Sequence, residues 1–293
     1  MNIKYFYVQK SGDVEMYTFL RFPDFRRKAV TLSYDDGVPA DKHLMEIIDK
    51  YGLKCTFNIN SELFPEESGK GFRMTREETY HLFAISGHEV AVHGAKHLCL
   101  TDVDKSMATR DVLVDRENLE KMFGRIMKGM AYANGATNDD VVQILKDCGI
   151  RYARTTVSTE KFDVPTDWLR MPATCHHKNP RLMELAKTFI ETDEHWYHWA
   201  NRAMLFSLWG HSYEFDECDN WDVLEEFAAY VGNRTDIWYA TNGEIFDYVQ
   251  AFNALEFSAD GNMIYNPTNT DIYLCYFKQN VMIPKGHTVT VSK

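Results

Sequence analysis

The chain has 293 residues, of which 45% are hydrophobic and 26% charged, a composition that excludes an intrinsically disordered protein and can bury a sizeable core. Its net charge of −11 argues against nucleic acid as a main partner, because a phosphate backbone would be repelled. No apolar run reaches the roughly 18 residues of a membrane span, and residues 1–7 do not resemble a signal peptide. The six cysteines include no C-x-x-C pair, so we expect a cytoplasmic protein with reduced thiols rather than disulfides.

Strand and helix patterns alternate along most of the chain. Apolar runs predict seven strands, which end at or near Tyr34, Asn60, His93, Tyr132, Arg154, Trp209 and Ala240. Amphipathic spacing and capping residues predict helices over about 40–51, 75–87, 105–124, 138–149, 220–231 and 243–254, and a further helix that opens at Asn179-Pro180. Strands that are each followed by a helix predict a parallel β/α array, either a barrel or a doubly wound sheet.

The last part of the chain has a different pattern. β-type runs at Asp271–Phe277, Val281–Ile283 and His287–Val291 are separated by glycine and Asn-Pro punctuation. We therefore expect residues 1–254 to form one β/α domain and residues 255–293 to form a small antiparallel β extension. The exposed edges of such strands could pair with the β/α domain or with a second protomer, so a homo-oligomer is one expected outcome.

Polar side chains follow three of the predicted strands. Asp35 and Asp36 come after the first strand, His93 and His97 lie about sixty residues later, and His211 follows the sixth strand. Since the loops at the carboxyl ends of parallel strands converge, we expect these side chains to meet. One carboxylate and two imidazoles suit a divalent transition metal, and the second carboxylate is then a candidate base for a water molecule.

Two other interpretations exist for these residues. A zincin motif would need Glu directly after His93 and a helix to carry both histidines, but Gly94 favours a loop. Asp-Asp-Gly is also a good turn sequence, and the histidines could be ordinary strand-end and surface residues. Three strands that each deliver an acid or an imidazole to one rim favour the metal site over both interpretations.

The order and spacing of these motifs resemble the polysaccharide deacetylases, a metal-dependent carbohydrate-esterase family. The matching features are Asp-Asp-Gly after the first strand, His-x3-His, and a late strand that ends in Leu208-Trp209-Gly210-His211. The resemblance covers roughly residues 28–245 and implies an α/β fold, a deformed (β/α)7-type barrel. It also implies the residue roles: Asp35 as general base, His211 as general acid, and Asp36, His93 and His97 as metal ligands.

The chain departs from the family pattern at two motifs. The family has Ser or Thr after its first metal histidine, where this chain has Gly94, so the hydrogen bond of that hydroxyl would be missing. The family motif Arg-x-Pro-aromatic-Gly falls on Ala131–Gly135, so the arginine that orients the base is absent, and we expect Arg154 to replace it. Asn134 could still donate its backbone N–H to the oxyanion, because that contact does not depend on the side chain.

Several neighbouring residues have open roles. Tyr132 or Trp209 could form an aromatic wall against a sugar, with core packing as the alternative. The family motif Asp-x-x-Asp-Trp tunes the acid histidine, and the nearest match, Asp163 to Trp168, is one residue too long. We favour packing or surface roles for His176, His177, His195 and His198.

The resemblance implies a metal-dependent hydrolase that removes N- or O-linked acetyl groups from a sugar or polysaccharide. Asp35 would deprotonate the attacking water, and His211 would protonate the leaving amine or alcohol. The same site could instead hydrolyse a small N-acyl compound that is not a sugar, or be a silenced carbohydrate-binding relative. One Asp and two His are compatible with Co, Ni or Fe(II), and Zn is the expected metal.

Overall fold

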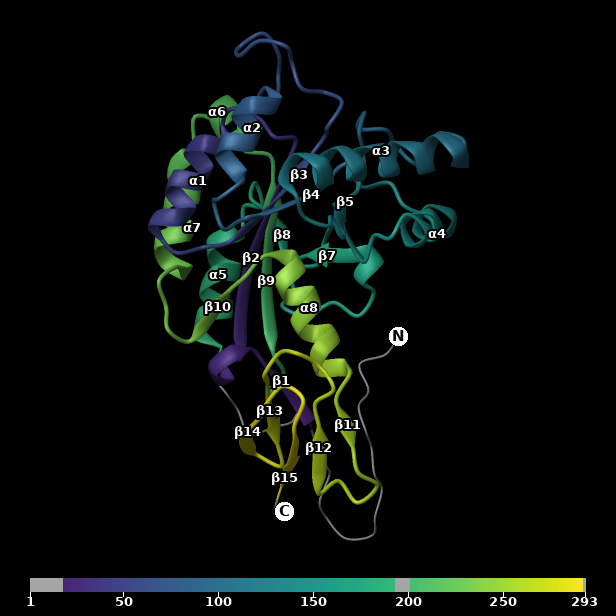
Figure 1. Ribbon diagram of the computed structural model, residues 1–293. Coiled ribbons are helices and arrows are strands. Elements are labelled where there is room, and N and C mark those ends of the chain that lie inside the picture. Colours follow the sequence, from purple (N-terminus) through teal and green to yellow (C-terminus); the bar gives the residue numbers. More distant parts are fainter. Residues whose placement is uncertain (1–17, 193–200, 292–293) are drawn as a thin grey trace.

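The structure is a computed structural model that describes residues 18–192 and 201–291 (Figure 1). Helices surround a parallel sheet, and a smaller group of antiparallel strands lies at one end of it. Residues 1–7, His195 and His198 lie outside the described residues. None of the described helices combines the length and apolar character needed to cross a membrane. All six cysteines are free thiols, and four of them are buried.

The parallel sheet has nine strands in the described part of the chain. They are β2 (Lys28–Asp35), β3 (Cys55–Ile59), β4 (Glu89–Val92), β5 (Gly129–Ala131), β6 (Tyr152–Ser158), β7 (Met171–Ala173), β8 (Cys175–His176), β9 (Met204–Gly210) and β10 (Ile237–Tyr239). The α-helices are α1 (Asp41–Lys50), α2 (Arg76–Phe83), α3 (Lys105–Phe123), α4 (Asp139–Asp147), α5 (Leu182–Glu191), α6 (Tyr213–Cys218), α7 (Trp221–Val231) and α8 (Asn242–Asn253). Short 3-10 turns lie at Pro23–Phe25, Ala133–Gly135 and Trp168–Arg170.

Residues 171–176 close the barrel. The strand order is β7-β6-β5-β4-β3-β2-β9-β8, and β7 and β8 are separated only by Thr174. Since β7 pairs with β6 and β8 pairs with β9, this one segment joins the two ends of the sheet. The predicted fold, a deformed (β/α)7-type barrel with a C-terminal β appendage, is confirmed.

The seventh predicted strand does not take the seventh position in the barrel. The seventh predicted strand, observed as β10, pairs only with Lys28–Val30 at the beginning of β2. The segment 171–176 completes the barrel instead. Its two strands pair over only two or three residues, and an apolar run that short does not predict a strand.

Side-chain caps mark the beginning of three of the described α-helices, α2, α4 and α8. At α2 the predicted capping box is present, because Thr75 accepts from the backbone N–H of Glu78 while the Glu78 carboxylate accepts from that of Thr75. The helix predicted to open at Asn179-Pro180 begins at Leu182 instead. The Asn179 side chain accepts from the backbone N–H of Arg181 at 2.8 Å, so it stabilises a turn before the helix and does not cap the helix itself.

The antiparallel strands form a small appendage at the end of the barrel where β2 and β9 begin (Figure 1). One sheet contains β1 (Thr18–Arg21), β13 (Ile272–Tyr276) and β14 (Gln279–Ile283). The other contains β11 (Glu256–Phe257), β12 (Met263–Tyr265) and β15 (Thr288–Thr290). Because β1 pairs with β13, the appendage takes in residues from before the barrel as well as after it.

An apolar cluster between α8 and the antiparallel strands attaches this appendage to the barrel. Ile264, Ile272 and Leu274 are fully buried, and they cluster with Ile245 and Val249 of α8. This burial stabilises the extension against its own barrel. A domain boundary between residues 254 and 255, and association of two protomers through the extension, stay predictions.

Substitution of Leu274 by alanine tests this attachment. Leu274→Ala should lower the free energy of unfolding by about 2–5 kcal/mol, because it leaves a cavity in a fully buried cluster. Met282→Ala on the neighbouring strand is the control, since Met282 is 39% exposed and should lose less than about 0.5 kcal/mol. Urea unfolding followed by circular dichroism measures both variants, and equal losses would contradict the packing.

Candidate functional site

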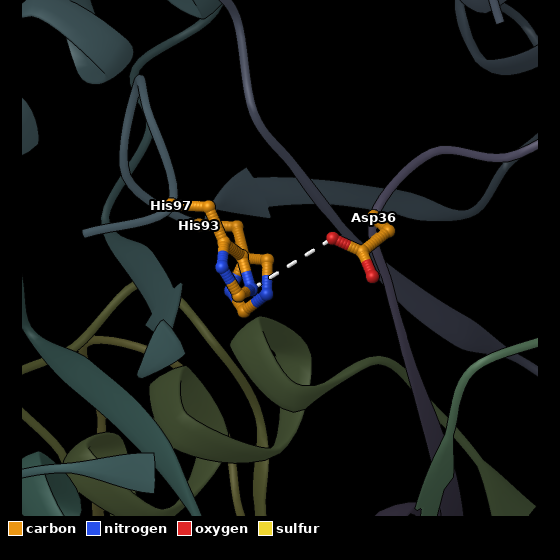
Figure 2. Close-up of side chains that lie close together, drawn as sticks. All are labelled: Asp36, His93 and His97. Carbon is orange, nitrogen blue, oxygen red and sulfur yellow. Dashed lines mark ion pairs between the residues drawn. The ribbon is translucent and has the colours of Figure 1, made fainter. Parts of the chain in front are cut away.

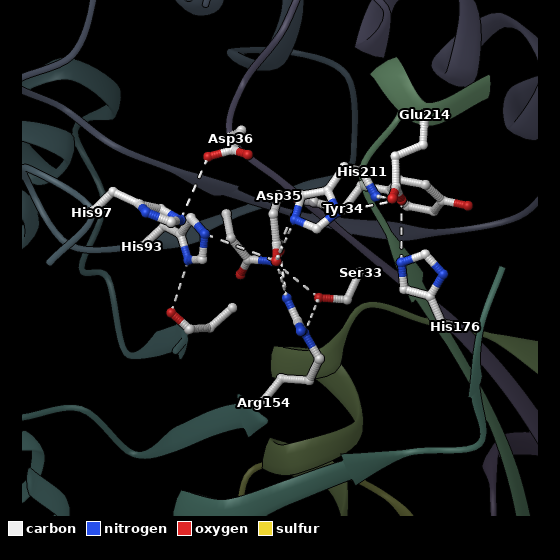
Figure 3. A network of polar contacts seen from close by, with 12 residues as sticks. Ser33, Tyr34, Asp35, Asp36, His93, His97, Arg154, His176, His211 and Glu214 are labelled. Carbon is white, nitrogen blue, oxygen red and sulfur yellow. Dashed lines mark hydrogen bonds and ion pairs between the residues drawn. The ribbon is translucent and has the colours of Figure 1, made fainter. Parts of the chain in front are cut away.

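The predicted site residues meet at the carboxyl end of the barrel strands (Figure 3). The register pairs Asp35 of β2 with Asn58 of β3, and β4 ends one residue before His93. β9 ends opposite Tyr34, one residue before His211. Parallel strands therefore bring side chains that are far apart in the sequence to one edge.

Asp36, His93 and His97 form a cluster with the donor set of a metal site (Figure 2). One ligand atom from each lies within 4.8 Å of the others. The Nδ1 of His93 donates to the carbonyl of Ala131 at 2.9 Å, which directs its Nε2 into the cluster. This Nε2 is buried and has no hydrogen-bond partner among the described residues. Such an orphaned nitrogen fits a divalent cation.

Burial also places His93 in the protonation state that a metal needs. The side chain is almost fully buried, and this desolvation holds the pKa of His93 below its ordinary value, against the opposing effect of Asp35 and Asp36. A neutral imidazole is the form that binds a metal.

Two carboxylates of α3 hold the loop that carries His93 and His97. Asp115 accepts from the backbone N–H of His93 at 2.9 Å and of Ser61 at 2.7 Å. Asp111 accepts from the backbone N–H of Lys96 at 2.8 Å. The other oxygen of Asp111 lies 2.4 Å from the position that a Cβ at Gly94 would occupy. The glycine that departs from the family pattern thus makes room for a carboxylate that supports the loop.

Substitution of Gly94 should disturb the metal site. Gly94→Ala combines a positive φ of +81° with a collision at Asp111, so we expect metal binding to weaken by at least about tenfold. Gly124→Ala is the matched control, because Gly124 has φ +65° but no atom within 4 Å of the added Cβ. Titration calorimetry with Zn²⁺ and a competing chelator measures both, and equal affinities for the two variants would contradict this role.

Asp35 is held by a buried arginine. Both carboxylate oxygens of Asp35 accept from the guanidinium of Arg154, and Asn58 Nδ2 donates to Asp35 Oδ1 at 2.8 Å. Burial alone would raise the pKa of Asp35, but Arg154, His93 and His211 lower it to about 2. Asp35 is therefore ionised at every ordinary pH. Arg154 makes the contact that we expected from its position in the sequence.

His211 lies on the other side of Asp35. Its Nε2 is 3.9 Å from Asp35 Oδ2, and its Nδ1 is 3.3 Å from Glu214 Oε2. Burial lowers the pKa of His211, but the hydrogen bond to Glu214 and the charges of Asp35 and Asp36 raise it above its ordinary value overall. A raised pKa favours the protonated imidazole that a general acid requires.

Glu214 is the carboxylate that sequence analysis missed. It accepts from Lys178 at 2.8 Å and lies 3.2 Å from the Nε2 atoms of His176 and His177, so these two histidines reach the site as well. Asp167 instead caps the turn Trp168–Arg170 and pairs with Arg170. Glu214 comes three residues after His211, but His211 lies before α6 and no helix was predicted there, so this spacing gave no signal.

Three other polar contacts stabilise the site, and no sequence motif predicted them. Arg73 donates to Asp36 Oδ1 at 2.5 Å and to Asn60 Oδ1 at 2.9 Å. Asp41 accepts from Ser212 Oγ at 2.6 Å, which connects the beginning of α1 to the loop after β9. These partners come from loops and from the first residue of a helix, where no periodic pattern marks them.

The aromatic residues proposed as a sugar wall are placed differently. Tyr132 is 1% exposed and its hydroxyl donates to the carbonyl of Leu169, so it has no open face for a sugar. Trp209 is 8% exposed, and its ring packs on the Arg154 guanidinium at 4.6 Å. Both rings pack inside the protein, which is the alternative that the sequence left open for Tyr132 and Trp209. Asn134 is exposed and lies on the turn after β5, with φ +57°.

Comparison with known families supports the resemblance. Residues 23–153 match the family model of the polysaccharide deacetylases. This range includes Asp35, Asp36, His93 and His97, whereas His211 lies beyond it. The predicted resemblance to this family is therefore confirmed. No curated protein sequence matches the chain.

Solved structures share the fold. A candidate polysaccharide deacetylase from Mycobacterium smegmatis is 17% identical with a TM-score of 0.55, and the match covers 82% of this chain and 96% of that chain. A mutant CE4 family pseudoenzyme with restored activity is 16% identical with a TM-score of 0.50, covering 78% and 70%. A Streptococcus pyogenes deacetylase in complex with acetate is 20% identical with a TM-score of 0.43, covering 48% and 61%. At these identities, the two structures with TM-scores of 0.50 and 0.55 establish the fold alone.

Proposed function

We propose that this chain, which carries a polysaccharide deacetylase match, is a metal-dependent hydrolase that removes acetyl groups from a sugar or polysaccharide. The observation that carries the proposal is the arrangement around Asp35. A buried, ionised carboxylate lies between a cluster of potential metal ligands on one side and a histidine of raised pKa on the other. This is the arrangement that acid–base hydrolysis of an acyl group needs.

Asp36, His93 and His97 would hold the divalent cation, with Zn as the expected metal and Co, Ni or Fe as alternatives. When bound, the cation would lower the pKa of a water molecule and polarise the acyl oxygen. The loop contacts from Asp111 and Asp115 would keep the two imidazoles in place. Burial holds the pKa of His93 below its ordinary value, which favours the neutral imidazole that a metal needs.

Asp35 and His211 would divide the proton transfers between them. Asp35 would accept the proton of the attacking water on its carboxylate, which Arg154 and Asn58 hold in place. His211 would donate the proton on its Nε2 to the leaving amine or alcohol, since its Nδ1 faces Glu214. The backbone N–H of Asn134 is our candidate donor to the oxyanion.

Two alternatives keep the same site. A small N-acyl compound could replace the sugar, with the same groups in the same roles. A silenced binding protein is the other alternative, because a pseudoenzyme is among the proteins that share the fold. The pairing of Arg154 with Asp35 supports an active site, since it supplies the cation that the altered third motif lacks.

Acetate release and metal content test the proposed function together. The wild type should contain near-stoichiometric Zn by elemental analysis and release acetate from acetylated sugars. His93→Ala should lose the metal, and Asp35→Asn should keep it but lose at least about a hundredfold in kcat. His81→Ala is the control, because His81 is exposed on α2.

The outcomes separate the alternatives. A chain that takes up no metal on dialysis would overturn the hydrolase mechanism. A metal-loaded chain without activity on acetylated sugars or small amides would favour the silenced relative.

The pH profile tests the role of Glu214. His211 must be protonated to act as an acid, so kcat should fall as the pH rises through the His211 pKa. Glu214→Gln removes a charge that raises this pKa, and the alkaline limb should move to lower pH with about a tenfold loss of kcat above neutrality. Glu225→Gln, at a surface pair with Lys50, is the control. An unchanged alkaline limb in Glu214→Gln would contradict the assignment.

A further inference from the structure

Two aromatic rings meet beside the site. Phe72 lies on the loop between β3 and α2, and Tyr213 is the first residue of α6, two residues after His211. The ring centroids are 4.9 Å apart with the planes at 70°. Phe72 is 52% exposed, and Tyr213 is partly exposed. The contact therefore joins two segments that flank the candidate site and leaves aromatic surface open to solvent.

This aromatic pair is anchored to the reacting groups. The Arg73 guanidinium lies 5.4 Å from the centre of the Phe72 ring and donates to Asp36 at 2.5 Å. The Tyr213 ring lies 5.3 Å from the His211 ring. One ring is thus connected to a candidate metal ligand, and the other to the candidate acid.

The exposure of Phe72 is set by its neighbours. Arg73 is held by Asp36 and Asn60, and Met74 is fully buried with its backbone N–H bonded to the Gly37 carbonyl at 3.0 Å. The backbone on the carboxyl side of Phe72 is therefore held in place while the Phe72 ring stays 52% exposed. An exposed apolar ring held beside a polar site is a typical binding surface.

We propose that Phe72 and Tyr213 form an aromatic platform that binds a pyranose ring of the substrate. The inference rests on the proposed function and names its substrate class, a sugar with an apolar C–H face. Such a face packs well on aromatic rings, while its hydroxyls stay in water. Tyr132 and Trp209 are buried, so they cannot present this surface. The platform would place the sugar ring with its acyl group between Asp36 and His211.

Binding of an oligosaccharide tests the platform independently of turnover. The probe is the β-1,4-linked tetramer of N-acetylglucosamine, titrated into metal-loaded Asp35→Asn protein by calorimetry. Phe72→Ala in this background should raise Kd by about tenfold, Tyr213→Ala should also weaken binding, and Phe72→Trp should restore it. Tyr265→Ala is the control, since Tyr265 is an exposed aromatic of the appendage.

The results distinguish the platform from the proposed function. Tetramer affinity that is equal in Phe72→Ala and its parent, or no tetramer binding to the parent, would overturn the platform whether or not the wild type releases acetate. Platform-dependent binding by a wild type that releases no acetate would support the platform and overturn the proposed function. Matching circular dichroism and thermal unfolding across the variants would exclude misfolding as the cause of weaker binding.

Discussion

The site depends on two arginines that neutralise a pair of buried carboxylates. Asp35 and Asp36 are adjacent and both buried, an arrangement that is costly without cations close by. Arg154 from β6 holds Asp35, and Arg73 from the loop before α2 holds Asp36. Each guanidinium comes from a segment far from the pair in sequence, so the barrel has to assemble before the two acids can be buried. The same pairing separates their roles, because it keeps Asp35 ionised beside the candidate ligands.

Support for the metal loop comes from α3 and not from the loop itself. Where the family has a hydroxyl, this chain has Gly94, and the carboxylate of Asp111 fills the space beside it. Asp111 and Asp115 bond backbone N–H groups of the loop, so they fix its path without constraining the side chains that it carries. Likewise, Glu214 from α6 stands beside His211, while the nearest match to the family motif faces Arg170. Equivalent contacts can thus arise from different elements when the barrel edge is the same.

Much of the fold was predictable because its patterns are local. Apolar runs and capping residues marked β2, β3 and β4 and the beginning of α2 to within a residue or two. The strand at residues 171–176 was missed because each half pairs with a different neighbour over two or three residues. α5 began later than predicted because the Asn179 side chain forms a turn first.

The sequence by itself determined the donor types, their order, and their places after successive strands, since parallel strands send such residues to one edge. It also pointed to Arg154 as the partner of Asp35. Tertiary structure alone decided that Glu214 faces His211, that Arg73 holds Asp36, and that Tyr132 and Trp209 are buried. These contacts depend on long-range packing between loops and helix ends. The spacing of residues along the chain does not predict which loops and helix ends meet.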